Sequence, residues 1–527
     1  MLLRVLAALV SGAALSLAFE PVAQPVVIPF AVAAYALCCR GLRARSGWLP
    51  GLAFGVGFQF VLIVWMRAVG TDAWLALASA EAAFLGILGA LTAVLVRHRW
   101  WPLWVAAAWV AVEVWRSGWP FSGMPWGRLA FATADTYVAG ALPWIGSVGV
   151  SFLLALSGTL LAWVVVARDR ERQVAGATLA GLVVVTLVPV VLPWESQPES
   201  EVTVAVVQGD VPGDGDDILY DFRQVTQNQV DLTVQLARDV EAGEEPRPDF
   251  VLWPENSTAV DPFRDSRTNT GIKTASAAIG VPILVGAIVD GGPEHVLNQG
   301  IVWDPATGAG DRYTKRHPVP FGEYIPGREF FTRQFGRLAE IPRDMLSGTR
   351  QTPLRIAGVE VADAICFDVA YDDAIYDQVS RGAELLTVQT SNATFIHTDQ
   401  VEQQFAITRL RALETGRWLA VSSTNGITGV IAPDGSVVAS AEQRTQDVLV
   451  ERVGLESSIT PAVRLGTWPG RILIALSAVG LVLAVLRPDV PYGRRRNRQQ
   501  AEDDGLTGSG VPVAAAAGHG ASEGTDG

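Results

Sequence analysis

The chain has 527 residues, about three times the usual size of one domain, so it contains more than one folding unit. Half of the residues are apolar, 18% are charged and the mean hydropathy is +0.29, values that argue against an ordinary water-soluble enzyme. The net charge of the chain is −13. The excess of acidic residues lies in residues 195–468, which contain 40 acidic and 22 basic side chains. An acidic segment of this kind is a poor partner for nucleic acid, so we expect no nucleic-acid binding.

Eight stretches are apolar and close to the length that crosses a bilayer, which predicts a polytopic α-helical membrane bundle of about eight spans. They cover residues 3–19, 23–39, 50–66, 73–96, 101–115, 144–167, 174–193 and 469–486. The first stretch could instead be a signal peptide, with Arg4 as its charged n-region and Leu2 to Phe19 as its apolar part. The lack of a small-residue cleavage site and the further apolar stretches that follow favour a membrane span.

Arginines are concentrated in alternate connections between these stretches. Arg4, segment 40–45, segment 97–99, segment 168–172 and the basic run 494–498 all fall on one side of an eight-span path. Because positive loops stay on the cytoplasmic side, we expect both termini in the cytoplasm and the long segment before the last span outside it. This pattern predicts a multi-pass protein of the cytoplasmic (inner) membrane.

The chain then divides into four parts. Residues 1–194 form the predicted N-terminal membrane domain, 195–468 an extracytoplasmic catalytic domain, 469–487 a C-terminal transmembrane helix and 488–527 a cytoplasmic tail. The tail is rich in Gly, Ala, Ser and acidic residues, a composition typical of disorder. The loop from Trp115 to Trp144 is rich in tryptophan and poor in charge, which predicts an aromatic belt at the membrane surface.

Short β-branched runs that alternate with amphipathic stretches indicate an α/β sandwich between residues 195 and 468. Helices are predicted for 220–242 and 398–415, and a hairpin turn at Pro433-Asp434-Gly435. The predicted strands are 202–207, 250–253, 283–289, 300–303, 359–366, 385–388, 419–423 and 429–432.

Three polar residues stand at the ends of predicted strands, where side chains can meet in a cleft above a sheet. Glu255 follows the run FVLWP, Lys315 lies in YTKR, and Cys366 closes the run VADAI. Lys315 is one of only two lysines in the chain, and Cys366 is the only cysteine of the acidic segment. A thiolate attacks carbonyl carbon, a carboxylate accepts the thiol proton and an ammonium stabilises an oxyanion, so these three residue types suit acyl chemistry.

The motifs WPEN at 253–256, YTKRHPVPFGEYIP at 313–326 and ICFD at 365–368 resemble the Glu-Lys-Cys triad of the nitrilase superfamily. Together with the eight predicted spans, they resemble the membrane-bound branch of that superfamily, the apolipoprotein N-acyltransferases. Further similar segments are WRSGWPFSGMPWGRLAF, VVQGDVP, TSNATF and the run 409–437. The resemblance implies an αββα sandwich in which Cys366 is the nucleophile, Glu255 the general base and Lys315 the stabiliser of the oxyanion.

The resemblance also implies supporting roles for four neighbouring residues. Glu323 matches a second family glutamate, and Tyr324 lies beside it in the same motif; Phe367 and Asp368 stand where the family often has an aromatic-glutamate pair. The shorter Asp368 keeps the carboxylate. Where the family has a tryptophan after VQGDVP, this chain has Ile218, Leu219, Tyr220 and Phe222, so the resemblance implies the reaction but not the details of the lid or acyl groove.

The implied reaction moves an acyl chain from a membrane phospholipid, through a cysteine thioester, to the N-terminal amine of a diacylglyceryl-cysteine apolipoprotein. We expect no cofactor and no metal, because His295, His317 and His397 lack ligand spacing, and we expect a monomer. One alternative is a membrane-tethered amidohydrolase that uses the same triad with water. Another, a transporter or scaffold, is disfavoured because Glu81 and Glu113 are nearly the only charges within the spans.

Overall fold

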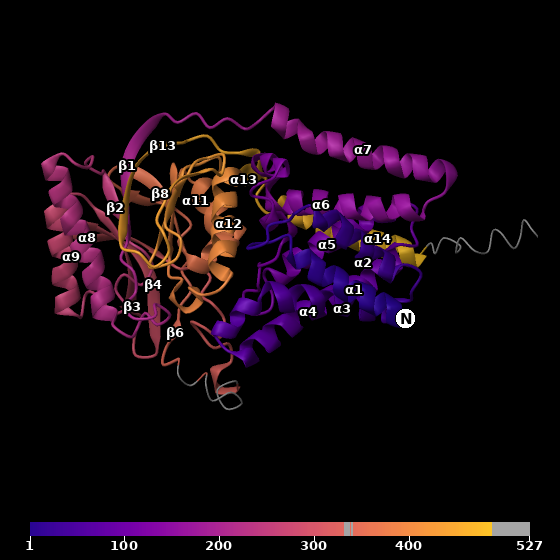
Figure 1. Ribbon diagram of the computed structural model, residues 1–527, viewed down its shortest axis with the longest axis horizontal. Helices are drawn as coiled ribbons and strands as arrows, with labels where there is room; N and C mark the ends of the chain where they lie inside the picture. The colour runs from indigo at the N-terminus through magenta and orange to yellow at the C-terminus, as the bar shows by residue number, and fades with distance from the viewer. Residues whose placement is uncertain (331–337, 339–340, 487–527) are drawn as a thin grey trace, which may run out of the picture.

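The computed structural model describes residues 1–330, 338 and 341–486; the predicted tail, 488–527, lies outside these residues. A helical part and an α/β part lie end to end (Figure 1). The chain builds most of the helical part first, passes through the α/β part after α7, and returns to the helices with α14.

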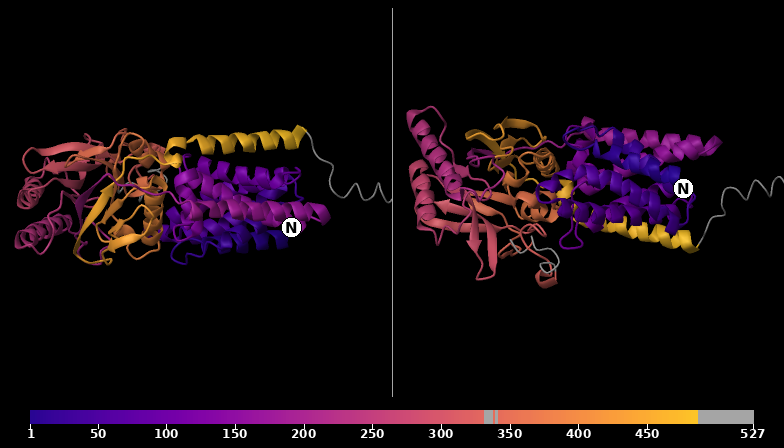
Figure 2. Two further views of the ribbon diagram at one scale, coloured as in Figure 1. Left: turned by 90° about the horizontal axis from the view of Figure 1, so that it is seen from above. Right: turned by 60° about the horizontal axis from the view of Figure 1, so that its bottom comes forward.

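A helix forms in each of the eight apolar stretches identified in the sequence. These helices are α1 Leu2–Ser16, α2 Val27–Cys39, α3 Ala44–Leu62, α4 Thr71–Leu95, α5 Trp101–Arg116, α6 Leu142–Val166, α7 Asp169–Val191 and α14 Trp468–Leu486. By length and composition, α4, segment Tyr137–Val166, α7 and α14 are long and apolar enough to cross a membrane. The apolar helices α1 and α2 are shorter, and α14 lies against the N-terminal helices despite its distance in sequence (Figure 2).

Two stacked sheets form the α/β part. In the first sheet the order is β13-β1-β2-β3-β4-β5, with β6 paired to β4, and in the second it is β12-β11-β10-β9-β8-β7. The first sheet comprises β1 Ser200–Gln208, β2 Phe250–Leu252, β3 Ile283–Asp290, β4 His295–Asp304, β5 Gly308–Thr314, β6 Asp344–Met345 and β13 Asp447–Leu455. The second comprises β7 Leu354–Ile356, β8 Val359–Ile365, β9 Leu385–Thr390, β10 Leu419–Ser423, β11 Gly429–Ile431 and β12 Val437–Ser440.

Alternation along the strands creates a layered core. In β1, Val204 and Val206 pack between the sheets, whereas Ala205 and Val207 pack under the outer helices. Those outer helices are α8 Phe222–Ala242 and α9 Ser266–Ile279. On the other side, α11 Asp372–Val379 and α12 Gln400–Thr415 lie between the second sheet and the helical part, and the short α13 Pro461–Leu465 leads into α14 (Figures 1 and 2). The result is an αββα sandwich, as expected from the sequence.

Two local expectations have different outcomes. The predicted turn is confirmed, since β11 and β12 pair antiparallel and the Gly435 N–H donates to the Ala432 carbonyl oxygen at 2.9 Å. The aromatic belt is wrong for Trp126, which is 3% exposed and donates its indole N–H to Gln403 of α12 at 2.7 Å. Trp119, by contrast, is 58% exposed. Part of this loop therefore fills the joint between the helical and α/β parts.

Buried charges cross the same joint. In α6 the backbone of Gly146 leaves the helical conformation (φ 68°), so the following N–H of Ser147 has no helical partner and donates to Glu414 Oε1 at 2.6 Å. Arg411 binds the other oxygen of Glu414 at 2.5 Å and also lies 3.0 Å from Asp372. Buried charges are costly unless paired, so Arg411 stabilises the Glu414 carboxylate, which in turn joins the α/β part to Ser147 of the helical part.

The charges at the joint predict a loss of stability when one of them is removed. Arg411→Ala leaves Glu414 and Asp372 without this partner, and breaking a buried pair typically costs about 3–5 kcal/mol. We expect the thermal unfolding midpoint of the detergent-solubilised protein to fall by several degrees. The matched control is Arg452→Ala, whose pair with Glu201 spans 3.7 Å between exposed side chains and contributes little. Equal midpoints for the two variants would contradict this account of the joint.

Candidate active site

The structure brings the three candidate residues from the ends of three strands to one place. Glu255 comes three residues after β2, Lys315 directly follows β5, and Cys366 directly follows β8. The first two strands belong to one sheet and β8 to the other, so the site lies where the two stacked sheets end. Lys315 Nζ lies 3.2 Å from Glu255 Oε1, and both charges act on the Cys366 thiol.

The ammonium of Lys315 is shared by two carboxylates. Its Nζ atom lies 2.7 Å from Glu323 Oε1, a shorter contact than that to Glu255. Lys315 is 1% exposed, and burial alone would lower the pKa of its ammonium. The nearby charges of Glu255, Glu323 and Cys366 outweigh burial and raise the pKa well above its usual value. Lys315 therefore remains a fixed positive charge.

Neighbouring groups fix the two carboxylates. Asn298 of β4 donates from Nδ2 to Glu255 Oε1 at 2.7 Å, and the Ser391 N–H donates to Glu255 Oε2 at 2.8 Å. Glu323 accepts the Val319 N–H on Oε2 at 2.8 Å, which leaves Oε1 for the lysine. Burial raises the pKa of the Glu323 carboxyl. Each carboxylate is thus oriented by a hydrogen bond other than that from the ammonium.

A glycine permits the close approach of the glutamate segment to the sheet. At Gly286 of β3, an added Cβ would lie 2.1 Å from the Pro254 carbonyl oxygen and 2.8 Å from the Glu255 Cα. Any side chain at this position would push the backbone of Glu255 away from the lysine. Glycine is therefore required at this position because a side chain would collide with the backbone of residues 254 and 255, and not because of its backbone conformation.

Cys366 occupies a strained turn. Its φ is 50°, a left-handed conformation that costs energy for a residue with a side chain, and strain of this kind is common at active sites. Burial and the negative charge of Glu255 raise the pKa of the Cys366 thiol to about 12, and Lys315 opposes them. The resting sulfur is therefore a thiol, and a base beside it would be required for it to act as a nucleophile. Glu255 is suited to accept that proton, and Lys315 to stabilise an oxyanion.

Besides Glu323, the three other supporting residues lie around this centre and make different contacts. Asp368 is fully buried and accepts the Tyr313 hydroxyl at 2.9 Å and the His317 N–H at 2.8 Å. It therefore joins the turn Cys366–Ala370, here called the cysteine turn, to the segment that begins at Lys315 after β5, here called the lysine loop. Phe367 stacks on Trp126 with centroids 6.2 Å apart. Tyr324 donates its hydroxyl to the Phe121 carbonyl oxygen at 3.2 Å. Phe367 and Tyr324 thus connect the site to the helical part.

Sequence reasoning missed Asn298 and Ser391, although both bind Glu255. Asn298 had one available signal, since it is a polar residue within a strand of mostly buried positions. Ser391 acts through its backbone N–H, which carries no signal in the sequence. Within the described residues, no group of three or more His, Cys, Asp or Glu side chains could hold a metal ion.

Comparisons with known proteins cover both parts of the chain. The model of the apolipoprotein N-acyltransferase N-terminal domain matches residues 11–160, and the carbon-nitrogen hydrolase model matches residues 203–460. The second match agrees with the αββα sandwich.

Similar curated proteins span nearly the whole chain. An apolipoprotein N-acyltransferase of Mycolicibacterium smegmatis is 35% identical over 505 residues, which cover 91% of this chain and 85% of the relative. One of Methylococcus capsulatus is 30% identical over 515 residues, covering 93% and 96%. Among solved structures, a mutant amidase of the nitrilase superfamily from Nesterenkonia AN1 is similar at 17% identity with a TM-score of 0.36, covering 50% of this chain and 95% of that one.

The electrostatics of the site predict how Cys366 reacts with iodoacetamide. Glu255→Gln removes a negative charge that raises the pKa of the thiol, so alkylation at about pH 9 should be severalfold faster than in the unaltered protein. Lys315→Met removes the opposing charge and should slow alkylation. Mass spectrometry of the Cys366 peptide separates this reaction from that of Cys38 and Cys39. Equal rates in all three proteins would contradict the electrostatic account.

Proposed function

Because the chain belongs to the apolipoprotein N-acyltransferase family and is an acyltransferase that acts on lipoproteins, we propose that a membrane phospholipid is its acyl donor and that Cys366 carries the acyl group. The acceptor in this proposal is the N-terminal amine of a diacylglyceryl-cysteine lipoprotein. One observation supports these roles above all: a single thiol lies beside a buried ammonium held by two carboxylates.

In the proposed first step, Cys366 Sγ attacks the ester carbonyl carbon of the phospholipid while Glu255 accepts the thiol proton. The carbonyl oxygen becomes an oxyanion, which Lys315 stabilises. When the intermediate collapses, the C–O bond breaks and the leaving lysophospholipid oxygen takes the proton from Glu255. The products are a thioester on Cys366 and a lysophospholipid with a free hydroxyl.

In the proposed second step, the neutral amine of the lipoprotein attacks the thioester carbonyl carbon. Glu255 accepts a proton from the attacking nitrogen, and Lys315 again stabilises the oxyanion. The C–S bond then breaks, and the leaving sulfur regains a proton from Glu255. An amide is more stable than a thioester, so this step runs towards the acylated lipoprotein.

Both proposed substrates carry acyl chains, and the attached helices hold the catalytic part close to the bilayer in which those chains lie. Removing a chain from the bilayer costs about 0.8 kcal/mol for each exposed CH₂ group. A catalytic part held at the membrane surface avoids this cost. The cysteine turn fits such a placement, because Phe367 and Tyr371 of that region contact Trp126 and Ser122 of the helical part.

For the membrane topology, we propose that all eight helices span the cytoplasmic membrane, with both termini in the cytoplasm and residues 195–468 outside. In support, the Arg4 guanidinium donates to the Arg40 carbonyl oxygen at 2.6 Å and that of Arg97 to the Leu42 carbonyl oxygen at 3.2 Å. Figure 1 places the N-terminus at the end of the helices opposite the α/β part, and these contacts join Arg4 and Arg97 to neighbouring positions 40 and 42 near that end. A basic cytoplasmic end agrees with the positive-inside rule. We further propose that the protein acts as a monomer.

Replacing the nucleophile tests the reaction. With Cys366→Ala or Cys366→Ser, incubation with phospholipid should yield at least ~10³-fold less acyl adduct, because neither side chain supplies a reactive thiolate. Mass spectrometry of the intact protein measures the adduct, and lipoprotein N-acylation is followed in parallel. An undiminished adduct would refute the role of Cys366, whereas steady release of free fatty acid without amine acylation would favour the amidohydrolase.

Accessibility to a membrane-impermeant thiol reagent tests the topology. In a Cys366→Ala background that also lacks Cys38 and Cys39, a cysteine introduced at the exposed position Glu241 of α8 should be labelled in intact spheroplasts. One introduced at the exposed position Arg170 should be labelled only after lysis. The reverse pattern would contradict the proposed orientation.

A further inference from the structure

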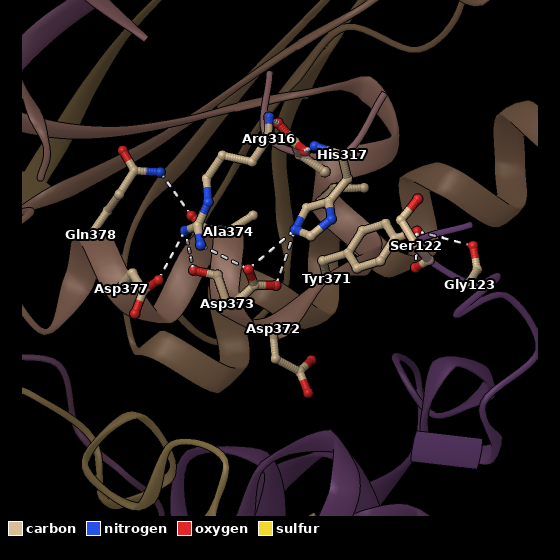
Figure 3. A network of polar contacts seen from close by, with 12 residues as sticks. Ser122, Gly123, Arg316, His317, Tyr371, Asp372, Asp373, Ala374, Asp377 and Gln378 are labelled. Carbon is tan, nitrogen blue, oxygen red and sulfur yellow. Dashed lines mark hydrogen bonds and ion pairs between the residues drawn. The ribbon is translucent and has the colours of Figure 1, made fainter. Parts of the chain in front are cut away.

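Two adjacent aspartates open α11, six and seven residues after Cys366, and their side chains point in opposite directions. Figure 3 shows Asp373 directed towards Arg316 and His317 of the lysine loop, while Asp372 is directed away from them. The proposed reaction gives a role to neither aspartate. Asp373 nevertheless contacts the two residues that follow Lys315, and Asp372 contacts Arg411, which also binds the turn that begins at Cys366.

Asp372 holds the beginning of α11 against the helical part. Arg128 binds its two oxygens at 2.9 and 3.2 Å, and Arg411 lies 3.0 Å from the nearer one. Burial opposes ionisation, but the two guanidinium groups outweigh it and lower the pKa of the Asp372 carboxyl to about 2. Arg411 also donates to the Val369 carbonyl oxygen at 2.7 Å, within the cysteine turn. These contacts give α11 and the cysteine turn a fixed position.

Asp373 holds the lysine loop against this fixed helix. Arg316 Nη2 lies 2.8 Å from Asp373 Oδ2, and Nη1 donates to the Asp373 carbonyl oxygen at 2.8 Å and lies 2.9 Å from Asp377. His317 Nε2 lies 3.1 and 3.2 Å from the two oxygens of Asp373. The imidazole ring of His317 also stacks on Tyr371, with centroids 3.7 Å apart and an interplanar angle of 3°.

The support from Asp373 begins where the backbone pairing ends. The Lys315 N–H still donates to the Asn298 carbonyl oxygen at 2.9 Å, and the Lys315 carbonyl oxygen accepts from the Gly348 N–H at 2.8 Å. Among the described residues 316–330, none belongs to a strand. Asp368 binds the backbone N–H groups of Arg316 and His317, and Asp373 binds their side chains. Two carboxylates on the cysteine side thus hold the two residues that follow the lysine.

We propose that Asp373, together with Arg316, is a positioning residue that sets the distance between the Lys315 ammonium and the Cys366 sulfur. This inference rests on the proposed function, since it assigns Lys315 to the oxyanion. Asp373 acts through the loop and does not touch the substrate. Its removal shifts the ammonium relative to the oxyanion and slows the formation of the acyl-enzyme, while the binding of phospholipid is unaffected.

The test compares Asp373→Asn and Arg316→Gln with the unaltered full-length protein in detergent micelles that contain phospholipid. Single-turnover release of lysophospholipid gives the rate of acyl-enzyme formation. For both variants we expect a rate about tenfold lower, with the phospholipid KM within about twofold and the melting temperature within a few degrees. Arg316→Lys keeps the charge but loses the planar fork, so it should recover part of the rate.

A matched control is Asp265→Asn. Asp265 lies at the beginning of a helix, as Asp373 does, and pairs with Arg223 at 3.2 Å, but it belongs to the outer helical layer away from the site. Its variant should keep the full rate. The proposal is overturned if Asp373→Asn matches the unaltered protein, or if its loss of rate equals that of Asp265→Asn.

Two further outcomes separate this proposal from the function on which it rests. If Asp373→Asn or Arg316→Gln only lowers the amount of folded protein, the rate per folded molecule is unchanged and Arg316→Lys recovers nothing. That outcome shows a structural role and overturns the positioning role. An unaltered protein that releases no lysophospholipid refutes the proposed function itself, and with it this inference.

Discussion

The site depends on one buried ammonium that two carboxylates share. Lys315 is 1% exposed, and a charge in such a place is costly unless it is paired and hydrogen-bonded. The contacts to Glu255 and Glu323 at 3.2 and 2.7 Å supply that pairing and also place the positive charge beside Cys366. Burial of the sulfur raises the pKa of the Cys366 thiol, and the negative charges of the two carboxylates raise it further. In the proposed reaction the sulfur therefore loses its proton only as it attacks, and Glu255, in contact with the lysine, is placed to receive that proton.

The need to hold the ammonium, the carboxylates and the thiol together also explains why the helical part contacts the residues around the site. The thiol, the ammonium and the carboxylates come from loops that follow three separate strands. Other contacts must therefore hold these loops in fixed positions relative to one another. On one side Asp368 and Asp373 join the lysine loop to the cysteine turn and to α11. On the other side, Arg128 and Trp126 of the helical part contact Asp372 and Phe367. A catalytic part supported in this way by apolar helices is suited to substrates that remain in a bilayer.

The sequence predicted the centre of the site better than its surroundings. Glu255, Lys315 and Cys366 were identifiable because each follows a strand-like run and because lysine and cysteine are rare in this chain. β5 was not predicted, since GAGDRYT contains two glycines and few apolar residues, and it is stabilised by its pairing with β4. The burial of Trp126 was missed because its partner Gln403 is 277 residues away, and tryptophan alone is equally typical of a membrane surface. Contacts of this range arise from tertiary packing, which local patterns do not encode.

The presence of only two lysines allows a direct measurement of the central interaction. In protein labelled with ¹⁵N at lysine Nζ, Lys315 can be assigned by comparison with a Lys273→Arg variant, and its NMR signal followed as the pH is raised. If two carboxylates hold the ammonium, Lys315 stays protonated beyond its usual pKa of 10.5 for as long as the protein remains folded. Deprotonation of Lys315 in the folded protein below that value would show that burial outweighs the carboxylates, and it would contradict the account of this site.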